Sequence, residues 1–195
     1  VQPHQAGEEV AGEQVVRPDL EVVTHPARLS PRPQHLGSEA REIGGWQDGA
    51  VCLFPKISGG HIIRNNTIRQ AGVCGAAGMG AKNCLIEDNL FENIGWQDAE
   101  HAFESGGLKL HGAVNCLIRR NIFRFIDYAP GLWLDLGDNN CRITRNIFTT
   151  IKTARAAIYI EVGRNLCSID HNIIHGITAQ YWLSGDYGAG GCGLY

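Results

Sequence analysis

Two acidic residues occupy equivalent positions in neighbouring copies of a repeated segment. Asp135 and Glu161 each lie six residues before a cysteine, Cys141 or Cys167, in the segments GLWLDLG and AIYIEVG. If both segments are strands of adjacent coils, the carboxyl groups lie one strand spacing apart, about 4.8 Å. Retaining glycosidases hold their two carboxyl groups about 5–5.5 Å apart, whereas inverting enzymes need about 6.5–9.5 Å. The spacing favours cleavage of a glycosidic bond with retention, by one carboxylate nucleophile and one protonated acid.

The residues around the pair alternate with period two. Leucines at 132, 134 and 136 and aliphatic residues at 158, 160 and 162 are expected to face the core, so Trp133 and Tyr159 should face outward with the acids. Two stacked like charges are unfavourable, so one carboxyl should keep its proton to higher pH. The plain alternative is two solvated acids on an exposed strand, which an aromatic platform of Trp133 and Tyr159 argues against.

An earlier segment, GLKLHG at 107–112, aligns with GLWLDLG if one residue is dropped in the following turn. The alignment places Lys109 beside Trp133 and His111 beside Asp135. Lys109 and His111 could bind sugar hydroxyls or lower the pKa of the nucleophile. An ordinary polar outer face is the alternative.

The elements that must position these residues follow from a repeat, C-x-I-x-x-N-x-[FI]-x-x-I. Copies lie at 84–94, 116–126, 141–151 and 167–177, with a weaker copy at 61–68 in which His61 takes the cysteine position. Leucine-rich repeats would show L-x-x-L-x-L, and helical arrays would show an i, i+3, i+4 stripe. Neither pattern is present, so the sequence predicts an all-β fold, a right-handed parallel β-helix of about five coils.

The repeat predicts specific strands and two interior columns. Strands are expected at 84–87, 108–111, 116–119, 132–136, 141–144, 157–162 and 167–170, with a further partial copy at 191–195. Cys84, Cys116, Cys141 and Cys167 should stack as a buried apolar column. The repeated asparagines should form a hydrogen-bonded ladder at a turn with left-handed φ. They are Asn66, Asn89, Asn121, Asn146 and Asn172.

One interval between asparagines is longer than the others and contains the insertion GWQDAEHAFES at 95–105. Extra residues in a solenoid map to a loop on one face, often the binding face. Trp96 in this loop is expected to stack on a sugar ring; a solvated loop is the alternative. Asp98, Glu100, His101 and Glu104 are the acidic and basic residues of the same loop.

Composition limits the remaining function classes. The chain has 195 residues, 44% of them apolar, and a net charge of −3, which argues against nucleic acid as a partner. No apolar run is long enough to span a membrane, and no signal-peptide pattern is visible, so cytoplasmic and secreted locations both stay open. No cysteine has metal-ligand spacing, so neither metal nor cofactor is expected. A homo-oligomer also stays open.

The first 55 residues differ from the rest, with six of the seven prolines and no asparagine. Residues 1–55 are expected to be a lead-in or the remnant of an upstream unit, and residues 56–195 the coils. Because the last coil has no cap, the sequence is interpreted as a fragment of a longer protein.

The segments GLKLHG, NCLIRRN, GLWLD, CRITRNIF, YIEVGRN and IDHNI resemble the β-helix core of glycoside hydrolase family 120, the β-xylosidases. The resemblance covers roughly residues 105–178, and its most specific part is the pair LWLD and EV on successive coils. It implies that Asp135 is the nucleophile and Glu161 the acid/base. One departure is Gly163-Arg164-Asn165, where the family has an Asn-His-Gly-like turn.

Three functions therefore compete. The first is a retaining β-xylosidase-like glycosidase acting on oligosaccharides from plant polysaccharides. The second is a polysaccharide lyase or epimerase with Lys109 or His111 as the base. The third is a non-catalytic carbohydrate-binding β-helix. The fold alone does not choose among them.

Overall fold

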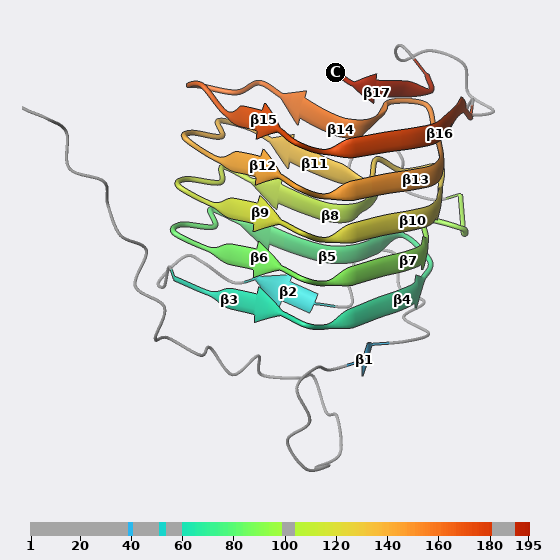
Figure 1. Cartoon of the computed structure of the whole chain (residues 1–195), viewed down its shortest axis with the longest axis horizontal. Helices are drawn as coiled ribbons and strands as arrows, with labels where there is room; N and C mark the ends of the chain where they lie inside the picture. The colour runs from blue at the N-terminus through green and yellow to red at the C-terminus, as the bar shows by residue number, and fades with distance from the viewer. Residues whose placement is uncertain (1–38, 41–50, 54–59, 99–103, 181–189) are drawn as a thin grey trace, which may run out of the picture.

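The chain winds into a stack of coils built from three parallel β-sheets (Figure 1). The computed structural model describes residues 39–40, 51–53, 60–98, 104–180 and 190–195. Each successive turn of the chain adds one strand to each sheet, and every strand pairs in parallel with the equivalent strand of the coils before and after it. The described residues form no helix, so none of them builds a helix able to span a membrane. This architecture is the predicted parallel β-helix.

We name the sheets A, B and C. Sheet A contains β1 (Glu39–Ala40), β4 (Thr67–Ala71), β7 (Leu90–Ile94), β10 (Ile122–Asp127), β13 (Ile147–Thr153) and β16 (Ile173–Ala179). Sheet B contains β2 (Val51–Leu53), β5 (Cys74–Met79), β8 (Gly106–His111), β11 (Leu132–Asp135), β14 (Ala156–Glu161) and β17 (Cys192–Leu194). Sheet C contains β3 (Ile62–Arg64), β6 (Leu85–Glu87), β9 (Leu117–Arg119), β12 (Arg142–Thr144) and β15 (Ser168–Asp170).

The predicted strands correspond to sheets B and C, and the partial copy at 191–195 is confirmed as β17, which pairs with β14. Apart from β1, each strand of sheet A follows a ladder asparagine, and these strands were not predicted. Two short strands from the first 55 residues, β1 and β2, pair with β4 and β5. The division of the chain near residue 56 stays a prediction.

The core consists of side chains stacked in register from coil to coil. The inward residues of sheet C form an isoleucine column, and those of sheet A form a stack of phenylalanine rings. The Phe91, Phe123 and Phe148 rings lie nearly parallel, with centroids 4.6 and 4.7 Å apart. Such pairs stabilise by about 0.5–1.5 kcal/mol beyond their buried area.

The cysteine column lies at the corner between sheets B and C. Cys84, Cys116 and Cys141 are buried and are not joined in disulfides, as predicted. Cys167, in the last of these coils, is only half-buried. The column is therefore an apolar stack of thiols whose last member is partly open.

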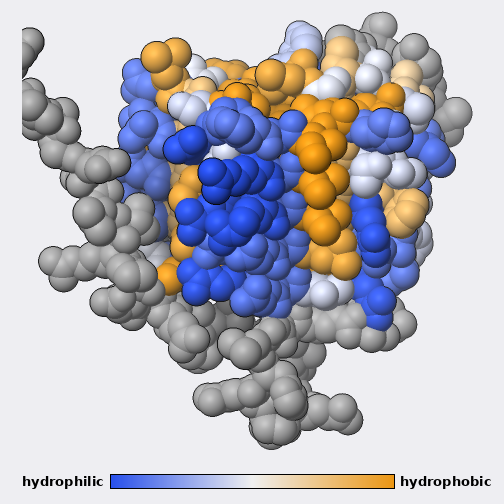
Figure 2. All heavy atoms as spheres, viewed as in Figure 1, coloured by the Kyte–Doolittle hydropathy of each residue, from blue (hydrophilic) through white to orange (hydrophobic). Residues whose placement is uncertain are grey.

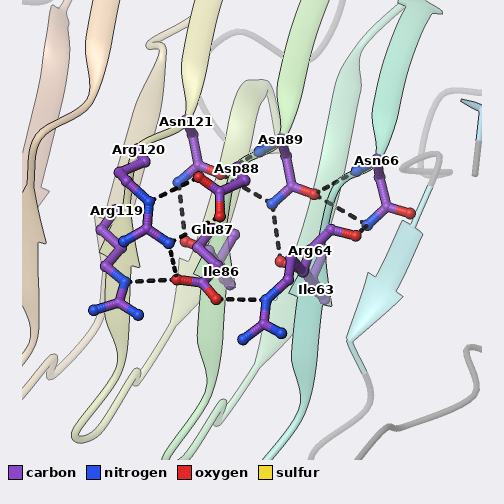
Figure 3. Close-up of polar contacts among 10 residues, drawn as sticks. All are labelled: Ile63, Arg64, Asn66, Ile86, Glu87, Asp88, Asn89, Arg119, Arg120 and Asn121. Atoms are coloured by element: carbon purple, nitrogen blue, oxygen red, sulfur yellow. Dashed lines mark hydrogen bonds and ion pairs between the residues drawn. The ribbon is translucent and has the colours of Figure 1, made fainter. Parts of the chain in front are cut away.

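The asparagine ladder is confirmed (Figure 3). Asn89 donates its backbone N–H and its Nδ2 to the Oδ1 of Asn121, at 3.0 and 2.9 Å, and Asn121 does the same to Asn146. A second Nδ2 bond from each interior asparagine reaches an isoleucine carbonyl of the preceding coil. The left-handed φ falls one residue before each ladder asparagine, not on it as predicted: the residues are Asn65, Asp88, Arg120, Arg145 and His171, with φ from 53° to 57°.

The end of each sheet B strand differs from the sequence prediction. Leu136 and Val162 were expected to face the core but are 60% and 67% exposed. Both have left-handed backbone, with φ of 59° and 52°, because β11 ends at Asp135 and β14 at Glu161. The chain turns the corner there, so the period-two alternation stops at the two acids.

Candidate functional site

The acidic pair lies at the carboxyl ends of two neighbouring strands of sheet B. The parallel register of β11 and β14 sets Asp135 opposite Glu161 and Trp133 opposite Tyr159. The register of β8 and β11 sets His111 opposite Asp135. Lys109 lies opposite Trp133 in that same pair of strands. The alignment made from the sequence is therefore confirmed, residue for residue, across three coils.

Asp135 is a buried carboxylate beside two basic side chains. It is 6% exposed, and its Oδ2 lies 3.3 Å from the Nζ of Lys109. The Nδ1 of His111 lies 3.2 Å from the same oxygen, within ion-pair distance but without hydrogen-bond geometry. A buried charge needs a compensating partner, and Lys109 supplies one.

Lys109 is itself buried, with an exposed fraction of 1%. Its Nζ lies 3.3 Å from the centre of the Trp133 ring, a cation–π contact that offsets part of the lost hydration. Burial lowers the pKa of Lys109, although the charge of Asp135 acts in the opposite direction. The lysine is therefore held in place between a carboxylate and an aromatic face.

Glu161 has a different environment, because it is only half-buried. The neighbouring Tyr159 is buried, which raises the pKa of its hydroxyl; the charge of Arg155 opposes this shift and that of Glu161 adds to it. The Nη1 of Arg155 lies 3.3 Å from the Tyr159 hydroxyl oxygen. The two acids of the pair thus differ in exposure and in neighbours.

The aromatic residues of this face are not an open platform. Trp133 and Tyr159 point away from the main core, as predicted, but they are only 1% and 4% exposed. With Ala156 they form a separate small cluster, in which the Trp133 and Tyr159 rings lie 5.3 Å apart. Their rings therefore support the acidic pair from the side and leave little surface on which a sugar could stack.

The insertion after β7 reaches the site through its last residues. The Oε2 of Glu104 lies 3.6 Å from the Nε2 of His111, which extends the charged row beyond Asp135. Trp96 is 49% exposed, and no hydrogen bond or ring contact among the described residues joins it to the acidic pair. Glu100 and His101 lie outside the described residues. Trp96 stays a predicted sugar contact.

Asp138 belongs to the same corner and was missed in the sequence. It is fully buried, accepts the Ala113 N–H at 2.8 Å through Oδ1, and has no hydrogen-bond partner for Oδ2 among the described residues. Burial raises its pKa to about 7, and the charge of Asp135 acts in the same direction. An aspartate in a turn is an ordinary turn residue, so only its position three residues after Asp135 could have signalled a role.

The described residues contain no group of three or more His, Cys, Asp or Glu placed to hold a metal ion. The row of side chains itself offers carboxyl, amino and imidazole groups. A buried carboxylate beside a half-buried one can supply a nucleophile and a proton donor.

Comparison with known proteins identifies the fold family. A family model described as "Right handed beta helix region" matches residues 42–193. No curated protein matches the chain. A solved structure of XylC in complex with xylose is 28% identical, covers 62% of this chain and 19% of that one, and has a TM-score of 0.48. The chain thus spans about a fifth of the length of that structure. Because the family model covers most of the sequence, the chain belongs to the right-handed β-helix family.

Proposed function

We propose that this protein is a retaining glycoside hydrolase, similar to the β-xylosidases of glycoside hydrolase family 120, that acts on oligosaccharides from plant polysaccharides. The observation that carries the proposal is the register of Asp135 with Glu161, two acids one strand spacing apart in unlike environments. Adjacent parallel strands lie about 4.8 Å apart, close to the carboxyl separation of retaining enzymes. The choice of xylosides as substrates rests on the resemblance of residues 105–178 to that family.

In the first step, a carboxylate oxygen of Asp135 attacks the anomeric carbon and forms a glycosyl–enzyme ester. The bond from that carbon to the leaving oxygen breaks, and Glu161 gives its proton to the leaving oxygen. The buried Lys109 and the nearby His111 keep the attacking carboxylate oriented, since both lie within ion-pair distance of its Oδ2. Asp135 thus meets the substrate already desolvated and aligned.

In the second step, the Glu161 carboxylate takes a proton from water, and the water oxygen attacks the anomeric carbon. The ester bond to Asp135 breaks, which restores the Asp135 carboxylate and the protonated Glu161. Glu161 is the more exposed of the two acids, which suits a group that exchanges protons with water.

The test uses an aryl β-xyloside with a good leaving group. Asp135→Ala should abolish release of the aryl alcohol, because no ester can form. Glu161→Ala should still release the first aryl alcohol, since a good leaving group needs little acid help, but should turn over slowly for want of a base. Azide needs no base, so it should restore turnover and yield a β-glycosyl azide.

A matched control is Asp127→Asn, a half-buried acid of β10 that pairs with Lys152. This variant should keep wild-type activity. Wild-type activity in both Asp135→Ala and Glu161→Ala would exclude the pair as the catalytic residues. Binding of xylo-oligosaccharides without any hydrolysis by the wild-type protein would favour the non-catalytic carbohydrate-binding function.

A second candidate, a polysaccharide lyase or epimerase, is favoured by the lowered pKa of Lys109, since such enzymes need a neutral base. The burial of Lys109 between Asp135 and Trp133 argues against it, because a base must reach the substrate carbon. Loss of uronate-polymer cleavage in Lys109→Met, with full activity in Glu161→Ala, would favour the lyase.

A further inference from the structure

A second cluster of charged side chains lies on the outer face of sheet C, away from the acidic pair. Its centre is Glu87, which is 1% exposed although it points away from the main core. The register of β3, β6 and β9 sets Arg64 and Arg119 on either side of it. Figure 2 shows hydrophilic side chains gathered over this sheet, beside a hydrophobic stripe. At the start of two neighbouring strands of sheet A, the partly exposed Ile122 and Ile147 lie in register.

Three guanidinium groups converge on the Glu87 carboxylate (Figure 3). The Nε of Arg64 donates to Oε1 at 2.5 Å, the Nε of Arg119 to Oε2 at 2.6 Å, and the Nη2 of Arg120 to Oε2 at 2.5 Å. Burial alone would raise the pKa of Glu87, but the hydrogen bonds from Arg119 and Arg64 outweigh it, so the pKa is lowered. The lowered pKa favours the ionised form of Glu87, whose carboxylate fixes the positions of the arginines through the hydrogen bonds.

The three arginines differ in how many hydrogen bonds their guanidinium groups make. Arg120 also makes two bonds to Asp88, through Nε and Nη2, each 2.8 Å long. Arg64 and Arg119 use only Nε, and their Nη atoms have no hydrogen-bond partner among the described residues. Both side chains are partly exposed, at 43% and 35%, and their Nη ends point the same way in Figure 3.

The cluster carries a net charge of +1, from three arginines and the two acids Glu87 and Asp88. The Glu87 carboxylate already bridges Arg64 and Arg119 on the buried side through their Nε atoms. The two Nε atoms are therefore separated by one carboxylate group and the hydrogen bond on each side of it. A second carboxylate can bridge the Nη ends from the solvent side and neutralise the remaining charge.

We infer that Arg64 and Arg119 form a carboxylate clamp, which binds a uronate group on the saccharide that the protein recognises. The saccharide part of this inference rests on the proposed function. Because the clamp lies on sheet C and the acidic pair on sheet B, the uronate belongs to a longer chain and not to the sugar being cleaved. The partly exposed pair Ile122 and Ile147 offers the sugar rings an apolar contact that a small inorganic anion cannot use.

The test measures binding by calorimetry in the Asp135→Ala background, so that turnover does not interfere. The probes are xylotriose, glucuronate-substituted xylotriose and inorganic phosphate. We expect the substituted trisaccharide to bind roughly 10-fold to 100-fold more tightly than xylotriose at low salt. Arg64→Gln and Arg119→Gln should each remove this preference, and salt of about 0.5 M should weaken it.

The matched control is Arg142→Gln, another exposed arginine of sheet C, which pairs with Asp170. It should leave the preference unchanged. Arg64→Gln leaves Glu87 short of a partner, so its fold is checked by thermal unfolding. If it unfolds early, Arg64→Lys decides, since it keeps the charge beside Glu87 and loses the planar fork.

Equal binding of the two trisaccharides by the Asp135→Ala protein would overturn the clamp, and so would loss of the preference in Arg142→Gln. Phosphate binding as tight as that of the substituted trisaccharide would overturn its assignment to a saccharide. Hydrolysis of neutral xylosides without any uronate preference would leave the proposed function intact and remove only the clamp. An arginine-dependent uronate preference without hydrolysis would support the clamp and contradict the proposed hydrolase function.

Discussion

At the scale of residues, the corner after β11 holds two aspartates with opposite environments. Asp135 has Lys109 within 3.3 Å of its Oδ2, so its negative charge is compensated. Asp138 is fully buried with one backbone N–H on Oδ1. Burial raises the pKa of Asp138 to about 7, with a further contribution from the charge of Asp135. Asp138 is thus protonated in mildly acidic solution and ionises near neutral pH.

This shift predicts a specific dependence of stability on pH. The unfolded chain releases the Asp138 proton near pH 3.8 and the folded chain near 7, so the folded state binds more protons between these values. Stability from Asp138 is full below about pH 4 and is lost as pH rises to about 7. Each tenfold change in proton affinity is worth about 1.4 kcal/mol, so the loss is at most about 4 kcal/mol.

Asp138→Asn should remove this dependence, because asparagine keeps the Oδ1 acceptor for the Ala113 N–H and cannot ionise. Urea unfolding should therefore show the variant to be more stable than the wild type at pH 8 and similar to it near pH 4. Asp127→Asn, at a half-buried position beside Lys152, is the control and should follow the wild type. Parallel stability curves for Asp138→Asn and the wild type would contradict the assignment.

At the scale of elements, the repeated asparagines bind more groups than a turn residue would. Asn146 donates to Asn172 Oδ1 and to the Ile118 carbonyl, and its own Oδ1 accepts from the Asn121 N–H and Nδ2. It is fully buried. Each such asparagine ties a coil to both of its neighbours through the strand edge of sheet A.

Asn146→Ala should therefore lower the free energy of unfolding by about 2–4 kcal/mol, more than the roughly 1 kcal/mol of a single hydrogen bond. The reason is that it leaves the buried Asn121 N–H and Ile118 carbonyl without this hydrogen-bond partner. Asn66→Ala is the matched control at the first rung, where the side chain is half-buried, and should cost less. Free energies of unfolding in urea measure both. Equal costs would mean that the additional buried groups bound by Asn146 contribute little.

The sequence predicted the strands of sheets B and C because Cys and Ile, or Leu and Leu, alternate there with period two. It did not predict sheet A, whose inward residues Phe91 and Ile94 are three positions apart. The reason is Asn93, whose φ of 54° breaks the alternation inside the strand; Phe125 and Thr150 do the same in β10 and β13. A left-handed residue inside a strand leaves no periodic signal.

The sequence predicted which residues of the candidate site lie side by side, but not how deeply they are buried or which loop residues contact them. Because Asp135 and Glu161 lie equally far before the aligned cysteines of their coils, the sequence predicted their register. Periodicity predicted on which side of the sheet Trp133 lies. It does not specify which residues pack on that side, so the burial of Trp133 was not predicted. The Glu104 contact with His111 depends on the path of a loop, which residue types do not specify.

At the scale of the whole molecule, each coil packs on the coils directly before and after it, so stability should vary along the axis. The inward isoleucines of sheet C show the gradient. Ile118 and Ile143 are fully buried, whereas Ile169 in the last of these strands is only partly buried.

Ile143→Ala should cost about 2–5 kcal/mol, because it leaves a cavity between two neighbouring coils. Ile169→Ala removes the same atoms from a position that is only partly buried, so it should cost distinctly less. Urea melts of the two variants provide the comparison. A neutral Ile143→Ala would contradict the inward packing of the column.

The asparagine ladder also gives the stack an electrical direction. The side-chain carbonyl of each asparagine from Asn89 to Asn172 points to the coil before it, where it accepts from the preceding asparagine. The amide dipoles therefore add along the axis, and each bond polarises the next. The N-terminal edge is the negative end of this row, so the two ends of the coil stack differ in potential even where their side chains are alike.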